Sequence, residues 1–155
     1  MNERVAAFGE RAATEYGLDI EAEEFPEGTK TAQDAATAID CEVAQIASSI
    51  VFMVDTVVVV VTSGANTVDT RKLSALRGVH DARMAEPEEV RKATGYAIGG
   101  VPPFCHDEEL PVYLDEELTD FETVWAAAGT PEAVFPITPE EIIEDAGAKV
   151  VDVTE

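Results

Sequence analysis

Hydrophobic and polar residues alternate along this chain with two periods, one typical of helices and one typical of strands. The segment 3–16 carries apolar residues three and four positions apart, and Gly17 follows as a residue suited to end a helix. Over 18–25, apolar and acidic residues alternate, which predicts a half-buried strand. Thr31 is followed three positions later by Asp34, a spacing typical of an N-cap residue and its partner. It predicts the start of a short alanine-rich helix.

The clearest pattern is a pair of segments rich in β-branched residues, 46–54 and 57–62, separated by Asp55-Thr56. A connection of two residues has the length of a tight hairpin. The block Val57–Val61 is apolar at every position. It therefore predicts a strand that is buried on both faces and lies at the centre of the sheet.

The second half of the chain continues to alternate between short helices and short strands. Glu86-Pro87 and Thr138-Pro139 each place a proline at a first-turn position with acids after it, so each predicts a helix start. The pattern predicts helices over about 68–76, 87–94 and 139–146, and strands over about 96–98, 110–114, 121–127, 133–135 and 149–153. Short strands interleaved with short helices predict an α+β fold: a single domain of 155 residues with a mixed, strongly curled sheet and flanking helices.

Acidic residues dominate the charge of the chain. Asp and Glu total 32 against 10 Lys and Arg, which gives a formal net charge of −22. Such a chain repels itself in dilute buffer, but molar salt shortens the Debye length to ~3 Å and screens the repulsion. The composition therefore favours a protein adapted to a salt-rich cytosol, as in halophiles, over a merely acidic mesophilic protein. It also argues against a basic patch for nucleic acid, so no DNA partner is expected.

Other features of the sequence argue against a membrane protein and a metal centre. No apolar run approaches the roughly 20 residues that span a bilayer, and the first residues lack the pattern of a secretory signal. We therefore expect a cytoplasmic protein without a membrane partner. Cys41 and Cys105 are far apart, and His80 and His106 are isolated, without the spacing of a zinc site. Free thiols, no metal and no cofactor are expected.

The segment Gly95–His106 is the most unusual stretch of the sequence, because two glycines are followed closely by two prolines. Gly99-Gly100 can take backbone conformations that are closed to other residues. Val101 and Pro102-Pro103 then form a stiff, extended piece in which neither proline donates an amide. Such a loop can bring main-chain N–H and C=O groups close to a small ligand. From composition alone, an ordinary connecting turn is an equally good interpretation.

Several segments, taken in order, resemble the YbaK / prolyl-tRNA-editing domain family. The resemblance extends from about Phe8 to Ile143 and includes the segments Thr31–Ala36, Gln45–Phe52, Ser63–Leu73, Thr94–Phe104, Asp115–Leu118 and Gly129–Glu141. It implies a compact α+β domain around a mixed, barrel-like sheet. It also implies hydrolysis of mischarged aminoacyl-tRNA at the 3′ end, either by a free-standing protein or by a domain inserted in prolyl-tRNA synthetase.

Two positions depart from the family pattern. The functional lysine of the family falls in an Ile-x-Lys-Ser-Leu type segment, which here is Ile46–Ile50 with Ser48 in place of the lysine. A hydroxyl cannot supply the fixed positive charge that would hold a phosphate or polarise an ester. The family loop commonly reads Gly-x-x-Pro-x-Gly, whereas here Cys105 ends it. Because cysteine takes a positive φ less readily than glycine, we expect a differently set loop.

Ester cleavage needs a pocket for the amino-acid side chain, dipoles for the developing oxyanion and a positioned nucleophile. The resemblance places the glycine–proline loop over the terminal ribose and ester, so Gly100 and Ser48 are the candidate catalytic residues. The candidate substrate-binding residues are Lys30, Thr31, Ser63, Asn66, Lys72, Gly99, Val101, Pro102, Pro103 and Asp115. A structural serine explains Ser48 about as well, a helix cap explains Asn66–Lys72 slightly better, and a turn explains Asp115 equally well. We expect Cys105 to be an unreactive loop residue rather than a nucleophile.

These observations favour an aminoacyl-tRNA deacylase-like trans-editing protein that acts on the 3′ end of mischarged aminoacyl-tRNA. The alternative is a non-catalytic binding module for an aminoacyl-adenosine-like or other small ligand, which the missing lysine favours. A purely structural partner domain has nothing specific in its favour, and a homodimer stays open. The interpretation requires the loop to border a cavity, and it requires Ser48 to lie on the loop's side of the sheet.

Overall fold

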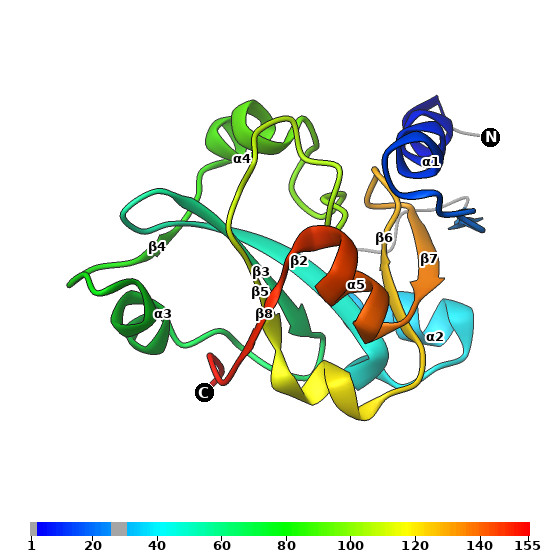
Figure 1. The fold of residues 1–155 in the computed structure, drawn as a ribbon. Coiled ribbons are helices and arrows are strands. Elements are labelled where there is room, and N and C mark those ends of the chain that lie inside the picture. The colour runs from blue at the N-terminus through cyan, green and yellow to red at the C-terminus, as the bar shows by residue number, and fades with distance from the viewer. Residues whose placement is uncertain (1–2, 26–30) are drawn as a thin grey trace.

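The fold is built on one mixed sheet with short helices around it (Figure 1). The computed structural model describes residues 3–25 and 31–155. Its helices are α1 (Glu3–Tyr16), α2 (Ala32–Ile39), α3 (Thr70–Arg77), α4 (Pro87–Thr94) and α5 (Pro139–Ala146), with 3₁₀ turns η1 (Val43–Gln45) and η2 (Glu116–Asp120). Its strands are β1 (Glu23–Glu24), β2 (Ile46–Met53), β3 (Val57–Ser63), β4 (Arg83–Met84), β5 (Val112–Asp115), β6 (Val124–Ala127), β7 (Ala133–Ile137) and β8 (Lys149–Val151).

The sheet is open. Its strand order is β1-β7-β6-β2-β3-β5-β8, with β4 paired to one end of β2. The hairpins β2–β3 and β6–β7 are antiparallel, whereas β2–β6, β3–β5 and β5–β8 pair in parallel. The predicted single domain with a mixed sheet and flanking short helices is confirmed. The strongly curled, barrel-like sheet is wrong, because the outermost strands β1 and β8 do not pair with each other.

The valine strand β3 lies in the middle of the sheet and is buried on both faces, as its sequence predicts. Its residues 58–61 are 0% exposed. Val59 and Val61 belong to the larger hydrophobic cluster, together with residues of α1, α4 and α5. Val58 and Val60 belong to a second cluster, with Leu73 of α3. Alternate side chains of one strand thus serve two hydrophobic layers.

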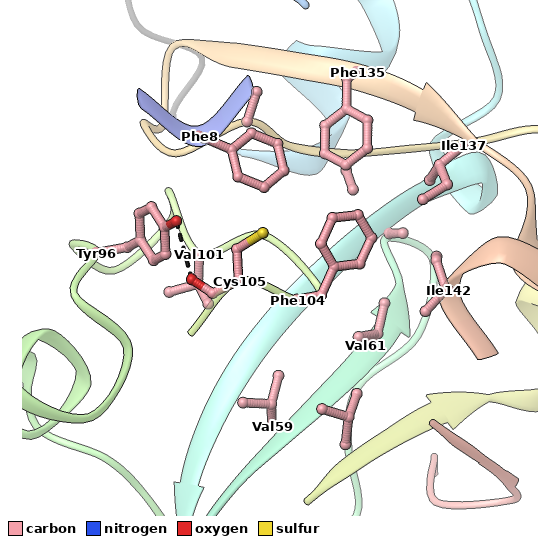
Figure 2. Close-up of a cluster of buried hydrophobic side chains, with 14 of the residues drawn as sticks. Phe8, Val59, Val61, Tyr96, Val101, Phe104, Cys105, Phe135, Ile137 and Ile142 are labelled. Carbon is pink, nitrogen blue, oxygen red and sulfur yellow. Dashed lines mark hydrogen bonds between the residues drawn. The ribbon is translucent and has the colours of Figure 1, made fainter. Parts of the chain in front are cut away.

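Aromatic rings tie the segment after α4 to the larger cluster (Figure 2). The ring of Phe104 lies 5.9 Å from that of Phe8 on α1 and 6.1 Å from that of Phe135 on β7, measured between centroids. Phe8 and Phe135 are themselves 5.2 Å apart. Such ring pairs stabilise a core by about 0.5–1.5 kcal/mol beyond the area that they bury. The glycine–proline loop is therefore anchored in the core by its own phenylalanine.

Most element ends follow the local signals in the sequence. The hydroxyl of Thr31 accepts a hydrogen bond from Asp34 N–H at 3.1 Å, as an N-cap does. Two predicted strands differ. The strand over 18–25 is reduced to the exposed pair β1, and the segment 96–98 forms a turn after Gly95 ends α4. No helix within 3–25 or 31–155 is long and apolar enough to cross a membrane.

Candidate functional site: a cavity beside the glycine–proline loop

The loop after α4 carries hydrogen bonds that set its shape. Tyr96 Oη donates to Cys105 O at 3.1 Å (Figure 2), and His106 Nε2 donates to Pro102 O at 2.8 Å. Burial lowers the pKa of His106, so the imidazole is neutral, with its proton on the nitrogen that faces the carbonyl. Arg11 of α1 donates to His106 O at 2.8 Å. The loop backbone is thus fixed at several points and tied to α1.

The two glycines of the loop meet different needs. Gly99 has a φ of +85°, a left-handed conformation that favours glycine. Gly100 has no positive φ, but a Cβ there would lie 2.8 Å from Thr130 Cα in the turn between β6 and β7. Real Cβ atoms do not approach backbone that closely, so only glycine fits. Gly100 therefore packs against the backbone of Thr130 in the β6–β7 turn, and Gly99 lies beside the ring of Pro131.

Cys105 takes a conformation that glycine adopts more readily. Its φ is +64°, which costs a non-glycine residue about 1–2 kcal/mol. Its side chain is buried in the larger hydrophobic cluster, and its carbonyl accepts the Tyr96 hydrogen bond. These contacts hold the cysteine in the left-handed region. The loop therefore takes a left-handed conformation at its cysteine.

A thiol reagent is expected to distinguish the two cysteines. Burial raises the pKa of Cys105 to about 12, so at pH 8 only about one molecule in 10⁴ carries that thiolate, whereas Cys41 is half-buried. We expect a chromogenic aromatic disulfide to modify Cys41 in the folded protein, and Cys105 only after denaturation. The matched variant Cys41→Ser removes the reaction of the folded protein. Fast modification of Cys105 in that variant would contradict its assignment as an inert loop residue.

A cavity of about 720 Å³ lies beside the loop, between the edge of β2, the start of α2 and the β6–β7 turn. Its walls are mostly apolar and include Ile46, Val90 and Trp125. Four of the predicted site residues line it: Thr31, Ser48, Gly99 and Val101. A pocket of this size and character fits a small ligand such as an amino-acid side chain with its attached ester.

The other predicted residues of the loop do not line this cavity. Gly100 and Pro102 are buried within the loop and do not line it. Pro103 lines a second cavity of about 380 Å³, which also includes Cys105. Lys30 lies outside the described residues. The structure therefore brings Gly99 and Val101 of the loop to the same cavity as Ser48.

The cavity exists because β2 loses its neighbour along part of one edge. β2 pairs with β6 only at residues 46 and 47, and with β4 only at 52 and 53. The stretch between, 48–51, borders the cavity instead. Ser48 and Ser49 both line the cavity, although successive side chains of a strand project to opposite faces. This is possible because the cavity lies at the edge of the strand and not over one face. By alternation, Ser48 shares its face of β2 with Ile46 and Ile50, whereas Val101 of the loop packs in the larger cluster with Ala47 and Val51 of the opposite face. Ser48 therefore lines the same cavity as the loop, but its side chain does not lie on the loop's side of the sheet, contrary to the expectation.

Ser49 is a site residue that the sequence did not single out. Its neighbours by alternation, Ala47 and Val51, belong to the larger hydrophobic cluster, which also holds Val101 of the loop. Its hydroxyl oxygen is buried, and no described group hydrogen-bonds it. The only signal in the sequence is the Ser48-Ser49 pair in an otherwise apolar strand.

Comparison with known proteins identifies the family. The family model for the aminoacyl-tRNA editing domain matches residues 26–144. The chain belongs to the aminoacyl-tRNA editing domain family. The uncharacterized protein YwhH of Bacillus subtilis is 37% identical over 141 residues, which make up 88% of this chain and 88% of YwhH. The resemblance seen in the ordered sequence segments is therefore confirmed.

Two further relatives differ in how much of their length this editing domain covers. A crystal structure described as a candidate trans-editing enzyme for prolyl tRNA synthetase has a TM-score of 0.94 and 41% identity, over 100% of this chain and 99% of that chain. A proline–tRNA ligase of Leuconostoc mesenteroides is 33% identical over 119 residues, 76% of this chain but 21% of the ligase. The editing domain is thus similar to a whole chain in one case and to part of a synthetase in the other.

A second group of predicted residues in the editing domain forms a polar cluster that does not line the 720 Å³ cavity. Asp115 is 0% exposed. Its carboxylate accepts hydrogen bonds from Thr62 Oγ1 at 3.2 Å, Ser63 N–H at 3.0 Å and Asn66 Nδ2 at 2.9 Å. It also accepts one from Glu117 N–H at 3.0 Å, which starts η2. The structure gives Asp115 the turn-forming position that the sequence offered as its alternative role.

Lys72 of the editing domain also lies apart from the cavity lining. Its Nζ lies 3.2 Å from Asp152 Oδ1 and donates to Thr154 O at 2.7 Å, so it joins α3 to the C-terminal segment. Among the described residues that line the cavity, Glu132 is the only charged one. No group of three or more His, Cys, Asp or Glu residues within 3–25 and 31–155 is arranged to hold a metal ion.

Proposed function

We propose that this editing domain is a free-standing aminoacyl-tRNA deacylase that removes a wrong amino acid from the tRNA 3′ end. One observation carries the proposal: in a chain of this family, Gly99 and Val101 of the loop and Ser48 of β2 line one cavity. The relatives named above support it, since one is described as a candidate trans-editing enzyme for prolyl tRNA synthetase.

The reaction is hydrolysis of the ester between the amino acid and the terminal ribose. Water adds to the ester carbonyl carbon, the bond to the ribose oxygen breaks, and that oxygen takes a proton. The products are a free amino acid and an uncharged tRNA. The rigid peptide groups of the loop supply fixed dipoles beside the developing oxyanion, and the apolar walls strengthen such dipoles by excluding water. Substrate hydroxyls orient the attacking water, with Ser48 as a subsidiary hydrogen-bonding group.

No positively charged side chain is found among the described residues that line the proposed catalytic cavity. The family resemblance places the functional lysine at position 48, where this chain has serine. Among the described lining residues, no lysine or arginine replaces it. The transition state of ester hydrolysis gathers negative charge, so a neutral site stabilises it less. We therefore expect slow deacylation by the natural protein.

Replacing Ser48 by lysine is expected to raise kcat/KM for deacylation by about 100-fold, the lower end of the range of about 10²–10³ for one electrostatic group in an oxyanion site. The measurement is hydrolysis of tRNAs mischarged with small amino acids, in molar KCl, because the net charge of −22 requires screening. Ser48→Met is the matched control, since it has similar length without charge. Equal rates for the lysine and methionine variants would contradict a role for charge at this position.

A second candidate function, a non-catalytic module that binds an aminoacyl-adenosine-like ligand, is favoured by the neutral wall at Ser48. The deacylation assay separates the two. If neither the natural protein nor Ser48→Lys exceeds the spontaneous rate, the enzyme proposal fails. Binding of a non-hydrolysable aminoacyl-adenosine mimic would then support the module. Action in a salt-rich cytosol, a homodimer and the exclusion of DNA stay predictions.

A further inference from the structure

The hydroxyl of Ser49 stands out against the other buried polar groups of the protein. Within the described residues, it is the buried side-chain oxygen for which no hydrogen-bond partner exists. The carboxylate of Asp115, by contrast, is satisfied by several donors. A buried hydroxyl without a partner costs about 1–3 kcal/mol. Ser49 is one of the residues that line the cavity, and a buried polar group without a partner calls for an explanation, such as a ligand that supplies the partner.

The backbone of Ser49 also faces the open edge of β2. Ile46 O accepts from Gly64 N–H at 2.8 Å, so the even-numbered residues of β2 direct their N–H and C=O groups toward β3. The odd-numbered residues direct theirs to the opposite edge, where Val51 O accepts from Ala85 N–H at 2.9 Å. There the pairing with β6 ends before Ser49, and the pairing with β4 begins after it. No described strand residue pairs with Ser49 on this edge.

One residue of the cavity lining therefore has three hydrogen-bonding groups without a described partner: a backbone N–H and C=O at the open strand edge, and a buried hydroxyl. The aminoacyl end of a charged tRNA offers the complement. Its α-ammonium is a donor, its ester carbonyl is an acceptor, and one carbon atom joins them. This order is that of a residue in a strand, and in an antiparallel hydrogen-bonded pair two residues exchange both N–H···O=C bonds. Ligands that add to a free strand edge in this way gain affinity from main-chain bonds.

We propose that Ser49 binds the aminoacyl group as a missing strand residue. Its C=O accepts a hydrogen bond from the α-ammonium, its N–H donates to the ester carbonyl, and its hydroxyl bonds the same aminoacyl group. The inference rests on the proposed function and adds a specificity to it. A blocked amino group loses donors and adds bulk at the strand edge, so the site rejects N-acylated aminoacyl ends, including those of peptidyl-tRNA.

The test uses 3′-(L-alanylamino)-3′-deoxyadenosine, in which an amide replaces the ester, and its N-acetyl derivative. Binding is measured by calorimetry with the full chain in molar KCl. For the natural protein, we expect N-acetylation to weaken binding at least about tenfold, the loss of one charged hydrogen bond. Ser49→Ala is expected to weaken binding of the unblocked ligand about five- to tenfold. Ser49→Thr, which keeps the hydroxyl on a residue suited to a strand, is expected to restore binding.

The Tm of the free protein distinguishes a ligand-binding serine from a structural one, because only the loss of a structural hydroxyl lowers it. Because no described group bonds the Ser49 hydroxyl, Ser49→Ala is expected to leave the Tm of the free protein unchanged or to raise it. A lowered Tm would assign the hydroxyl a structural role and overturn the inference. Equal affinity for the blocked and unblocked ligands would also overturn it, while leaving the deacylase proposal in place. Failure to bind either ligand would overturn both.

Discussion

Gly100→Ala is expected to lower kcat/KM for deacylation about 100-fold and the free energy of unfolding by about 2 kcal/mol. The new Cβ would lie 2.8 Å from Thr130 Cα, 3.0 Å from Thr130 C and 3.1 Å from Pro131 Cδ. The first two are backbone atoms and cannot swing aside, so the loop and the β6–β7 turn must separate. Displacement of catalytic groups by about 1 Å is enough for a 100-fold loss. The measurements are deacylation kinetics and denaturant unfolding.

The matched control is Gly9→Ala in α1. A Cβ at Gly9 meets no atom within 4 Å. Alanine in a helix interior is better than glycine by about 0.5–1 kcal/mol, so this variant is expected to be more stable with unchanged activity. A Gly100→Ala protein with the natural rate would show that the loop is not positioned by its contact with the β6–β7 turn, and would remove the loop from the proposed site.

Asp115→Ala is expected to lower the free energy of unfolding by about 3–5 kcal/mol, because it leaves several buried donors without an acceptor, at about 1–3 kcal/mol each. Asp115 is 0% exposed, and its two oxygens accept from two side chains and two backbone N–H groups. Alanine leaves all of these donors without an acceptor. For a domain of this size, the loss corresponds to a fall in Tm of about 10 °C. Calorimetry in molar KCl measures it.

Asp152→Ala is the control, because it removes one carboxylate and changes the net charge equally. The Asp152–Lys72 pair is 3.2 Å apart, and both side chains are more than two-fifths exposed. Exposed pairs contribute about 1 kcal/mol or less, and molar salt screens them further. We therefore expect a small change for this variant. A similarly small change for Asp115→Ala would mean that its cluster does not stabilise the junction of β3 and β5.

The elements that the sequence predicts well are those whose signals are local. The helix over 3–16 ends at Gly17 as expected, because helical spacing and a glycine C-terminus act within one turn. Thr31 caps α2 through a contact only three residues away. The valine block predicts its own burial, since no alternation leaves a face for solvent. Family membership was also accessible, because ordered motifs are read directly from the chain.

The features that the sequence does not predict depend on distant segments. The strand expected over 96–98 is a turn, because its residues bond within the loop, where Tyr96 Oη donates to Cys105 O and Gly100 N–H donates to Ala97 O, rather than to a neighbouring strand. The prediction of a closed sheet was wrong because closure requires contact between β1 and β8, which come from distant parts of the chain. Ser63, Asn66 and Asp115 look like pocket residues in sequence, yet their polar groups satisfy one another.

The sequence by itself determined the helices, the hairpins, the central valine strand and the family, because capping, periodicity and motif order are properties of neighbouring residues. Only the tertiary structure decided which side chains share a cavity. On the edge of β2 away from β3, the partners come from segments about 30 and 80 residues away along the chain, and the two pairings stop short of each other at Ser48–Val51. At that interruption β2 borders the cavity, which Ser48 lines together with Gly99 and Val101, and the buried hydroxyl of Ser49 has no described partner.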